Sequence, residues 1–189
     1  MNNKFLLIAL LSIAITNVTA QKLTGNISPL KNQKEVNVVL DFTETLAEGM
    51  AVEKYIDIKT KGKTDEQKAQ FLKEMNEQLR SEAYIALTGK MNVVVNEKLF
   101  SVGDYPNAEY TILVKVIDFH PGAFPMKHAQ VSVDVNFVKT GESAPFASVA
   151  FNKVLGRMSA NVPLWVTRTV MAFGYAGDGI GNLMVKNLK

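Results

Sequence analysis

The stretch VSVDVNF, residues 131 to 137, decides the fold class of this 189-residue chain. Its valines and Phe137 alternate with Ser132, Asp134 and Asn136, which is the period of a strand with one buried face and one wet face. Such alternation is typical of antiparallel sheets, because the strands of parallel sheets are covered on both faces and read as continuous apolar runs. The pattern therefore predicts a sheet that other elements cover on one side.

Further strand-like runs surround this stretch. The four runs in order are Met91 to Asn96, Glu109 to His120, Gln130 to Lys139 and Phe146 to Val154. Short turns separate the last three, with Pro121-Gly122 in one turn and Thr140-Gly141-Glu142 in the next, and turns of this length join neighbouring antiparallel strands. The runs therefore predict a meander. Tyr110 to Phe119 is apolar on both faces apart from Lys115 and Asp118, so we expect this strand to lie centrally.

Upstream of the meander the sequence predicts one strand and one helix. Val36, Val38, Leu40 and Phe42 alternate as in a half-buried strand. The segment Ala51 to Lys59 fits either a short helix or an extended piece.

Thr64 to Gln67 then fits a capping box, which marks the start of a helix. We expect this helix to end near Leu87, with Gly89 as its stop. Its apolar face would carry Leu72, Met75, Leu79, Ala83 and Ala86.

The C-terminal stretch GYAGDGIGNLM, residues 174 to 184, is rich in glycine but lacks the context of a phosphate loop. It matches neither G-x-G-x-x-G nor a Walker motif. Projected as a helix, residues 166 to 188 place Gly174, Gly177 and Gly181 on the apolar side, whereas Arg168 falls on another side. The glycines therefore predict a helix that packs closely, and we expect the sheet to be the partner. Whether this helix is continuous through Asp178-Gly179 stays open.

Together these elements predict an α+β fold. The expected order is β-α-β-β-β-β-α, with a mostly antiparallel sheet of about five strands and two long helices packed on it. No repeat or linker interrupts the chain, so we expect a single domain over residues 35–189, preceded by a polar lead over residues 21–34.

The N-terminus predicts export. Lys4, an apolar run from Phe5 to about Ile15 and the small-residue exit Val18-Thr19-Ala20 form a signal peptide pattern, with the mature chain beginning at Gln21. The apolar run is shorter than the roughly 20 residues that span a bilayer, so the mature chain should have no transmembrane segment. We expect a periplasmic or secreted protein.

Composition excludes several classes of function. The chain contains no cysteine, which excludes disulfides, thiol catalysis and a lipid anchor on cysteine. The formal net charge is +3 at pH 7 and the lysines are scattered among acidic residues, so we expect no nucleic-acid partner. No cofactor motif is present, and we expect no cofactor.

Two small groups of residues are candidate sites. Asp118, His120 and His128 flank one turn of the meander and could converge on a metal ion or act in acid–base chemistry. The alternative is that both histidines are ordinary residues at the rim of the sheet. Phe124 and Met126 in the same turn, together with Trp165, are candidates for contact with a protein partner.

Several runs resemble a family of uncharacterised secreted proteins of Bacteroides-type bacteria. These runs are VNVVLDFTETLAEGM (36–50), EKYIDI (53–58), YPNAEYTILVKVIDFHPG (105–122), AQVSVDVNFV (129–138) and ASVAF (147–151). More distantly, the meander and the last helix are similar to α/β domains of bacterial envelope proteins such as the curli secretion protein CsgG and the TolB N-terminal domain. The resemblance implies an envelope location and structural motifs, and it assigns no functional residue.

These observations favour a non-catalytic binding or assembly module that acts through a protein partner in the cell envelope. The alternatives are a metal-dependent or acid–base enzyme that uses Asp118, His120 and His128, and a protein that binds a small ligand between helix and sheet. No catalytic residue is assigned, and the sequence leaves the oligomeric state open.

Overall fold

The computed structural model describes residues 22–96 and 99–189, so the expected signal peptide lies outside the described residues. Within these ranges the chain forms eight strands: β1 (Thr24–Gly25), β2 (Glu35–Asp41), β3 (Leu46–Ala47), β4 (Met50–Ala51), β5 (Ser101–Gly103), β6 (Tyr110–His120), β7 (Gln130–Lys139) and β8 (Ala147–Leu155). The helices are α1 (Val52–Thr60), α2 (Asp65–Lys73), α3 (Leu79–Val95) and α4 (Trp165–Leu188). One π-helical turn, Glu74–Gln78, joins α2 to α3. Short 3₁₀ turns lie at Ser28–Leu30 and Ser159–Asn161.

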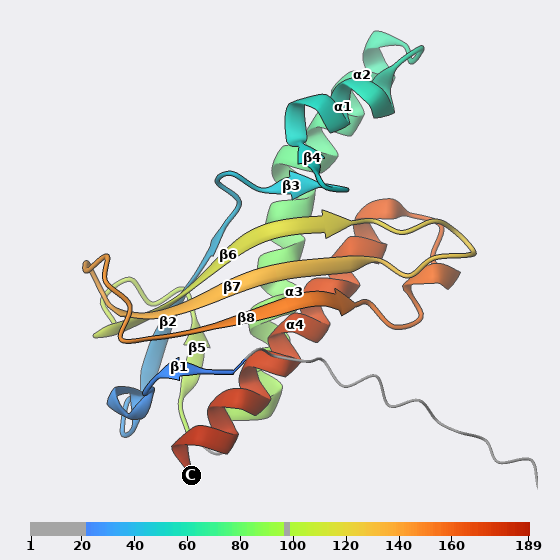
Figure 1. The fold of residues 1–189 in the computed structure, drawn as a ribbon. Coiled ribbons are helices and arrows are strands. Elements are labelled where there is room, and N and C mark those ends of the chain that lie inside the picture. Colours follow the sequence, from blue (N-terminus) through green and yellow to red (C-terminus); the bar gives the residue numbers. More distant parts are fainter. Residues whose placement is uncertain (1–21, 97–98) are drawn as a thin grey trace, which may run out of the picture.

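The predicted meander is confirmed. Strands β6, β7 and β8 pair antiparallel in sequence order, and β6 also has parallel neighbours on its other side. Val131, Val133, Val135 and Phe137 of β7 are buried, whereas the polar residues between them are half-exposed. The strand that decides the fold class therefore has one face in the core, and the α+β class holds (Figure 1).

The expected sheet of about five strands is wrong in number, and the sheet is mixed, although most of its residue pairs are antiparallel as expected. The sheet has eight strands, and its main path runs β1-β8-β7-β6-β2-β5. Strand β2 pairs parallel with both β5 and β6. The physical reason is that helices α1 to α3 connect β2 to the following strands, and a crossover of this length returns the chain parallel to its start. The predicted element order omits the short strands β1, β3 and β4.

The predicted strand Met91 to Asn96 is wrong, as is the predicted helix end at Leu87. Helix α3 continues to Val95, because Met91 and Val95 extend the four-residue spacing of its buried positions and both are fully buried. Gly89 is an interior residue of α3, where an added Cβ would meet nothing within 4 Å. Tertiary burial therefore overrides the strand propensity of the valine-rich run.

The predicted helix start at Thr64 is confirmed. The Thr64 hydroxyl accepts from the Gln67 backbone N–H at 3.3 Å, and the Gln67 side chain accepts from the Thr64 N–H at 3.1 Å. Phe71, rather than Leu72, takes the buried position in α2. The ambiguous segment that precedes it forms helix α1.

Helix α4 is continuous from Trp165 to Leu188, through Asp178 and Gly179. Its glycines lie against α3 rather than against the sheet, which corrects the expected partner. Gly177 faces the backbone of Leu87, and Gly181 faces Val94. Since these contacts advance along both helices in the same direction, α3 and α4 are parallel.

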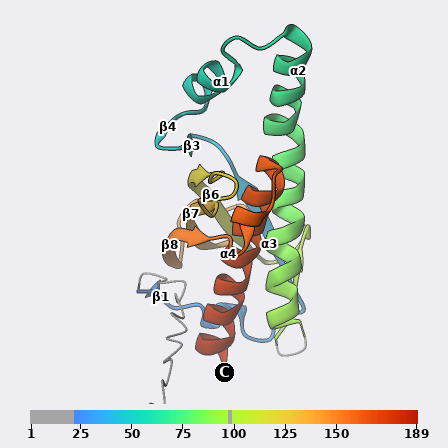
Figure 2. The ribbon, with the colours of Figure 1, turned by 90° about the vertical axis from the view of Figure 1, so that its right-hand side faces the viewer.

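The molecule has two layers and a projecting arm. Helices α3 and α4 lie on one side of the sheet, with α4 packed against β7 and β8 (Figure 2). Helices α1 and α2 extend beyond the edge of the sheet (Figure 1). The lead before β2 contributes β1, which pairs with β8, and the buried side chains of Ile27 and Leu30. Among the described residues, no helix is both long and apolar enough to cross a membrane.

Candidate binding pocket

The structure brings together two of the three residues that the sequence suggested as metal ligands. His120 Nε2 lies 2.7 Å from Asp118 Oδ2, and Asp118 Oδ1 accepts a hydrogen bond of 3.1 Å from the Gly49 N–H. His128 is turned elsewhere, and its Nδ1 accepts from the Ala160 N–H at 3.5 Å. Across residues 22–96 and 99–189, no three His, Asp or Glu side chains are placed to share a metal ion.

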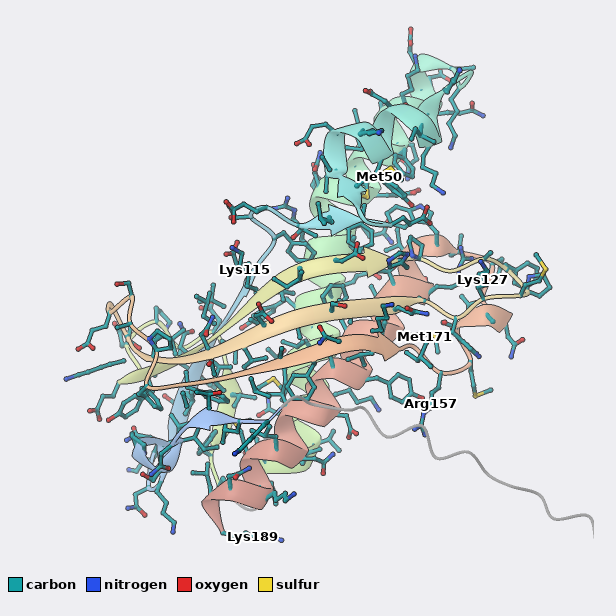
Figure 3. The ribbon with its side chains drawn as sticks, viewed as in Figure 1. Met50, Lys115, Lys127, Arg157, Met171 and Lys189 are labelled. Atoms are coloured by element: carbon teal, nitrogen blue, oxygen red, sulfur yellow. The ribbon has the colours of Figure 1, made fainter. Side chains whose placement is uncertain are left out.

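The candidate partner-contact residues separate into two places. Phe124 and Met126 are exposed in the loop between β6 and β7, and Figure 3 places their neighbour Lys127 at the far end of this hairpin. Trp165 is the first residue of α4 and is half-buried, with its Nε1–H donating to Glu74 Oε2 at 2.7 Å. It therefore lies at the base of the helical arm.

A pocket of about 560 Å³ lies at this base. Its walls come from α1, α2, the first turns of α4 and the start of the β6–β7 loop, which are far apart in the sequence. Three aromatic rings line it. The Phe71 ring centroid lies 5.3 Å from that of Trp165 and 6.3 Å from that of Tyr55. Aromatic walls with a few polar groups are typical of small-molecule sites.

The charges that line the pocket are balanced. The cations are Lys59, Lys63 and Arg168, and the anions are Glu48, Glu66 and Glu74. Lys59 forms an ion pair of 3.4 Å with Glu48 and lies over the Tyr55 ring, 5.0 Å from its centroid. Lys63 lies 5.3 Å from the centroid of the Phe71 ring.

Arg168 differs from these lysines because it is buried. The sequence projection placed it on a polar side of the helix, but only 7% of its surface is exposed. Its Nε donates to the Pro121 carbonyl at 2.8 Å, and its Nη1 donates to the carbonyls of Val162 at 2.9 Å and Pro163 at 2.6 Å. Burial lowers the pKa of the guanidinium, and nearby Tyr55 acts in the opposite direction. Arginine nevertheless stays charged in proteins.

Tyr55 stands beside Arg168 and is more deeply buried, at 3% exposed. Burial is the main reason that its pKa is raised, and the Glu48 carboxylate raises it further. The phenol therefore keeps its proton at neutral pH and presents an O–H donor. Sequence reasoning missed both residues, because Tyr55 lies in a segment of ambiguous pattern and Arg168 fits a solvent-facing position by periodicity alone.

A second hollow lies on the outer face of the paired helices. It has a volume of about 600 Å³ and is lined by residues of α3 and α4. Ile85 is 67% exposed and Val93 is 80% exposed, and both stand beside Gly89, which leaves the helix surface bare between them. Met171 and Tyr175 of α4 form the opposite wall. This surface is called here the α3–α4 groove. The sequence analysis missed it because Gly89 was predicted as a helix stop and Val93 as part of a strand.

The fold defines the class: an α+β domain in which two parallel helices cover one face of a mixed sheet. No protein-family model matches the chain, and no curated protein matches it. Among solved structures, the PelC dodecamer from Paraburkholderia phytofirmans is similar with a TM-score of 0.47 and 10% identity, covering 85% of this chain and 97% of that one. A variant of that dodecamer has a TM-score of 0.39 and 11% identity, covering 86% and 98% of the two chains. The resemblance to CsgG and TolB domains stays a prediction.

Proposed function

We propose that this chain is an exported, non-catalytic assembly module of the cell envelope, and that it joins a second copy of itself through the α3–α4 groove. The observation that carries the proposal is the exposure of Ile85 and Val93 on either side of Gly89. Apolar side chains exposed together around a hollow mark contact surfaces. The N-terminal signal pattern supports export.

The shape of the groove is self-complementary. Ile85, Gly89 and Val93 are spaced four residues apart, so they lie along one face of α3 as a projection, a gap and a second projection. A two-fold contact places the same patch on both copies. With Gly89 near the two-fold axis, Ile85 of one copy meets Val93 of the other, and the missing side chain lets the helices approach.

The charges of the groove are also self-complementary. Lys90 lines it from α3 and Asp178 lines it from α4. Among the described residues neither forms an ion pair. A two-fold contact brings Lys90 of one copy toward Asp178 of the other, so each copy supplies the counter-ion that the other lacks.

The histidine site has a structural role that suits a binding module. Asp118 pairs with His120, and its other carboxylate oxygen accepts from the Gly49 N–H, which holds the β3–β4 turn to the end of β6. His128 is engaged with the backbone at Ala160.

Sedimentation velocity of the purified protein over a concentration series tests the assembly. We expect reversible association of the wild type and loss of association in Val93→Glu, because the substitution places an unpaired carboxylate against Ile85 of the other copy. Ile58→Glu is the matched control, since Ile58 is also an exposed apolar residue but lies on α1, outside the groove. It should associate as the wild type does. A monomeric wild type, or a Val93→Glu variant that still associates, refutes the proposal.

A further inference from the structure

Two donors that line the pocket at the base of the arm have no hydrogen-bond partner within the described residues. The Tyr55 hydroxyl has no hydrogen bond within the described residues, and neither has the Nη2 nitrogen of Arg168, although Nε and Nη1 of the same guanidinium are engaged. Both side chains are more than nine-tenths buried and both line the pocket. Neither atom is among the fully enclosed side-chain atoms that lack a partner, so both donors are open to the pocket and can serve a ligand that enters it.

Arg168 also lacks a counter-ion. No carboxylate of the described residues lies within ion-pair distance of it, and the two lysines that line the pocket add to its charge. Three carbonyl dipoles offset part of the desolvation cost of the guanidinium, but they carry no full negative charge. An anion that enters the pocket would supply one.

We propose that this pocket binds a carboxylate carried on a planar or apolar body, with the carboxylate accepting hydrogen bonds from Arg168 Nη2 and the Tyr55 hydroxyl. Hydrogen bonds from a guanidinium and a phenol to one anion are charge-assisted, and these are the strong ones. The site is distinct from the α3–α4 groove, and no residue lines both.

The charge balance of the pocket favours a carboxylate over a phosphate. Three cations face three carboxylates, so the lining as a whole offers no excess of positive charge. A single negative charge next to Arg168 is offset by the guanidinium. A dianionic phosphate brings a second charge and three oxygens into a lining that also holds Glu48, Glu66 and Glu74, and like charges repel.

The aromatic walls select the body of the ligand. Phe71 and Trp165 are tilted by 34° to each other, and Tyr55 completes the lining from α1. Rings in this arrangement offer faces and edges to a flat molecule. The Lys63 side chain lies over the Phe71 ring, and it is flexible enough to move aside when a ligand enters.

The fluorescence of Trp165 reports directly on this site, because Trp165 is the single tryptophan of the chain and it lines the pocket. Benzoate is the probe, and benzamide is its neutral control with the same ring. We expect a saturable fluorescence change with benzoate at a Kd on the order of 1 mM, as suits so small a ligand. Benzamide and inorganic phosphate should each bind at least about tenfold more weakly.

Two variants localise the binding. Tyr55→Phe removes only the hydroxyl and should weaken benzoate binding by about tenfold or more, since a hydrogen bond to a charged group is lost. Tyr110→Phe is the matched control, because Tyr110 lies on β6 away from the pocket, and it should bind as the wild type does. Arg168→Gln should abolish binding. If circular dichroism shows that Arg168→Gln does not fold, Tyr55→Phe decides alone.

Three results would overturn the proposal: the absence of a saturable change with benzoate well above the expected Kd, equal binding of benzamide or phosphate, or unchanged binding by Tyr55→Phe. The test is independent of the assembly proposal. Val93→Glu lies outside the pocket, so it should leave benzoate binding unchanged even where it abolishes association.

Discussion

The close approach of α3 and α4 predicts opposite effects for the same substitution at two glycines three residues apart. An added Cβ at Gly177 would lie 2.9 Å from the carbonyl carbon of Leu87 and 3.0 Å from its Cα. An added Cβ at Gly174 would lie 3.5 Å from Cγ of Lys90, which is an ordinary contact with a flexible side chain. Gly177→Ala should therefore destabilise the fold, and Gly174→Ala should not.

The magnitude follows from two terms. Replacing an interior helix glycine by alanine favours the helix by about 1 kcal/mol. At Gly177 this gain is opposed by overpacking, which costs about 1 to 3 kcal/mol, and the upper end applies because the obstacle is backbone. We expect a net loss of about 2 kcal/mol for Gly177→Ala and a gain of up to about 1 kcal/mol for Gly174→Ala.

Equilibrium unfolding in urea, followed by circular dichroism at 222 nm, measures the free energy of unfolding of both variants and of the wild type. Thermal unfolding gives the same comparison as a melting temperature. For a chain of this size, each kcal/mol shifts Tm by about 2 to 4 °C, so Gly177→Ala should melt roughly 4 to 8 °C below the wild type. A Gly177→Ala variant as stable as the wild type would show that the backbones of α3 and α4 are not in contact between Leu87 and Gly177. Loss of stability in Gly174→Ala would contradict the open space beside it.

Two further predictions concern local structure. Thr64→Ala removes the hydroxyl of the capping box and should lower the free energy of unfolding by about 1 kcal/mol, whereas Thr64→Ser should restore it; equal stability of all three proteins would refute the role of the cap. The pKa of Asp41 is lowered from 3.8, chiefly by hydrogen bonding to Thr43, so its stabilising effect is present at neutral pH and is lost as the pH falls below that value. Asp41→Asn should flatten this part of the pH profile of stability, and an unchanged profile would contradict it.

The strands of the meander and the start of α2 were predictable because their signals are local. Alternation in residues 131–137 records which side chains are buried, and the hydroxyl of Thr64 caps a helix that begins within the next residue. Such patterns depend on neighbours in the chain and survive any change of tertiary partner.

The end of α3 was not predictable in this way. The run from Met91 to Val95 has the composition of a strand, and Gly89 reads as a stop. The helix continues because α4 is parallel to α3 and its glycines let the two backbones approach along several turns. That partner is more than 80 residues distant in the sequence, and no local pattern records it.

The residues of the candidate site were likewise predictable only in part. The sequence identified Asp118, His120 and Trp165 as residues of interest, but it placed Arg168 on the wrong side and left Tyr55 in an ambiguous segment. The pocket assembles Tyr55, Phe71, Trp165 and Arg168 from three helices, so its chemistry exists only after the arm has packed against the first turn of α4. By itself the sequence determined the strand faces, the capped helix and the apolar stripe of the last helix. The tertiary structure alone decided what covers each apolar face and which polar groups are buried together, because periodicity records that a face is buried and not what buries it.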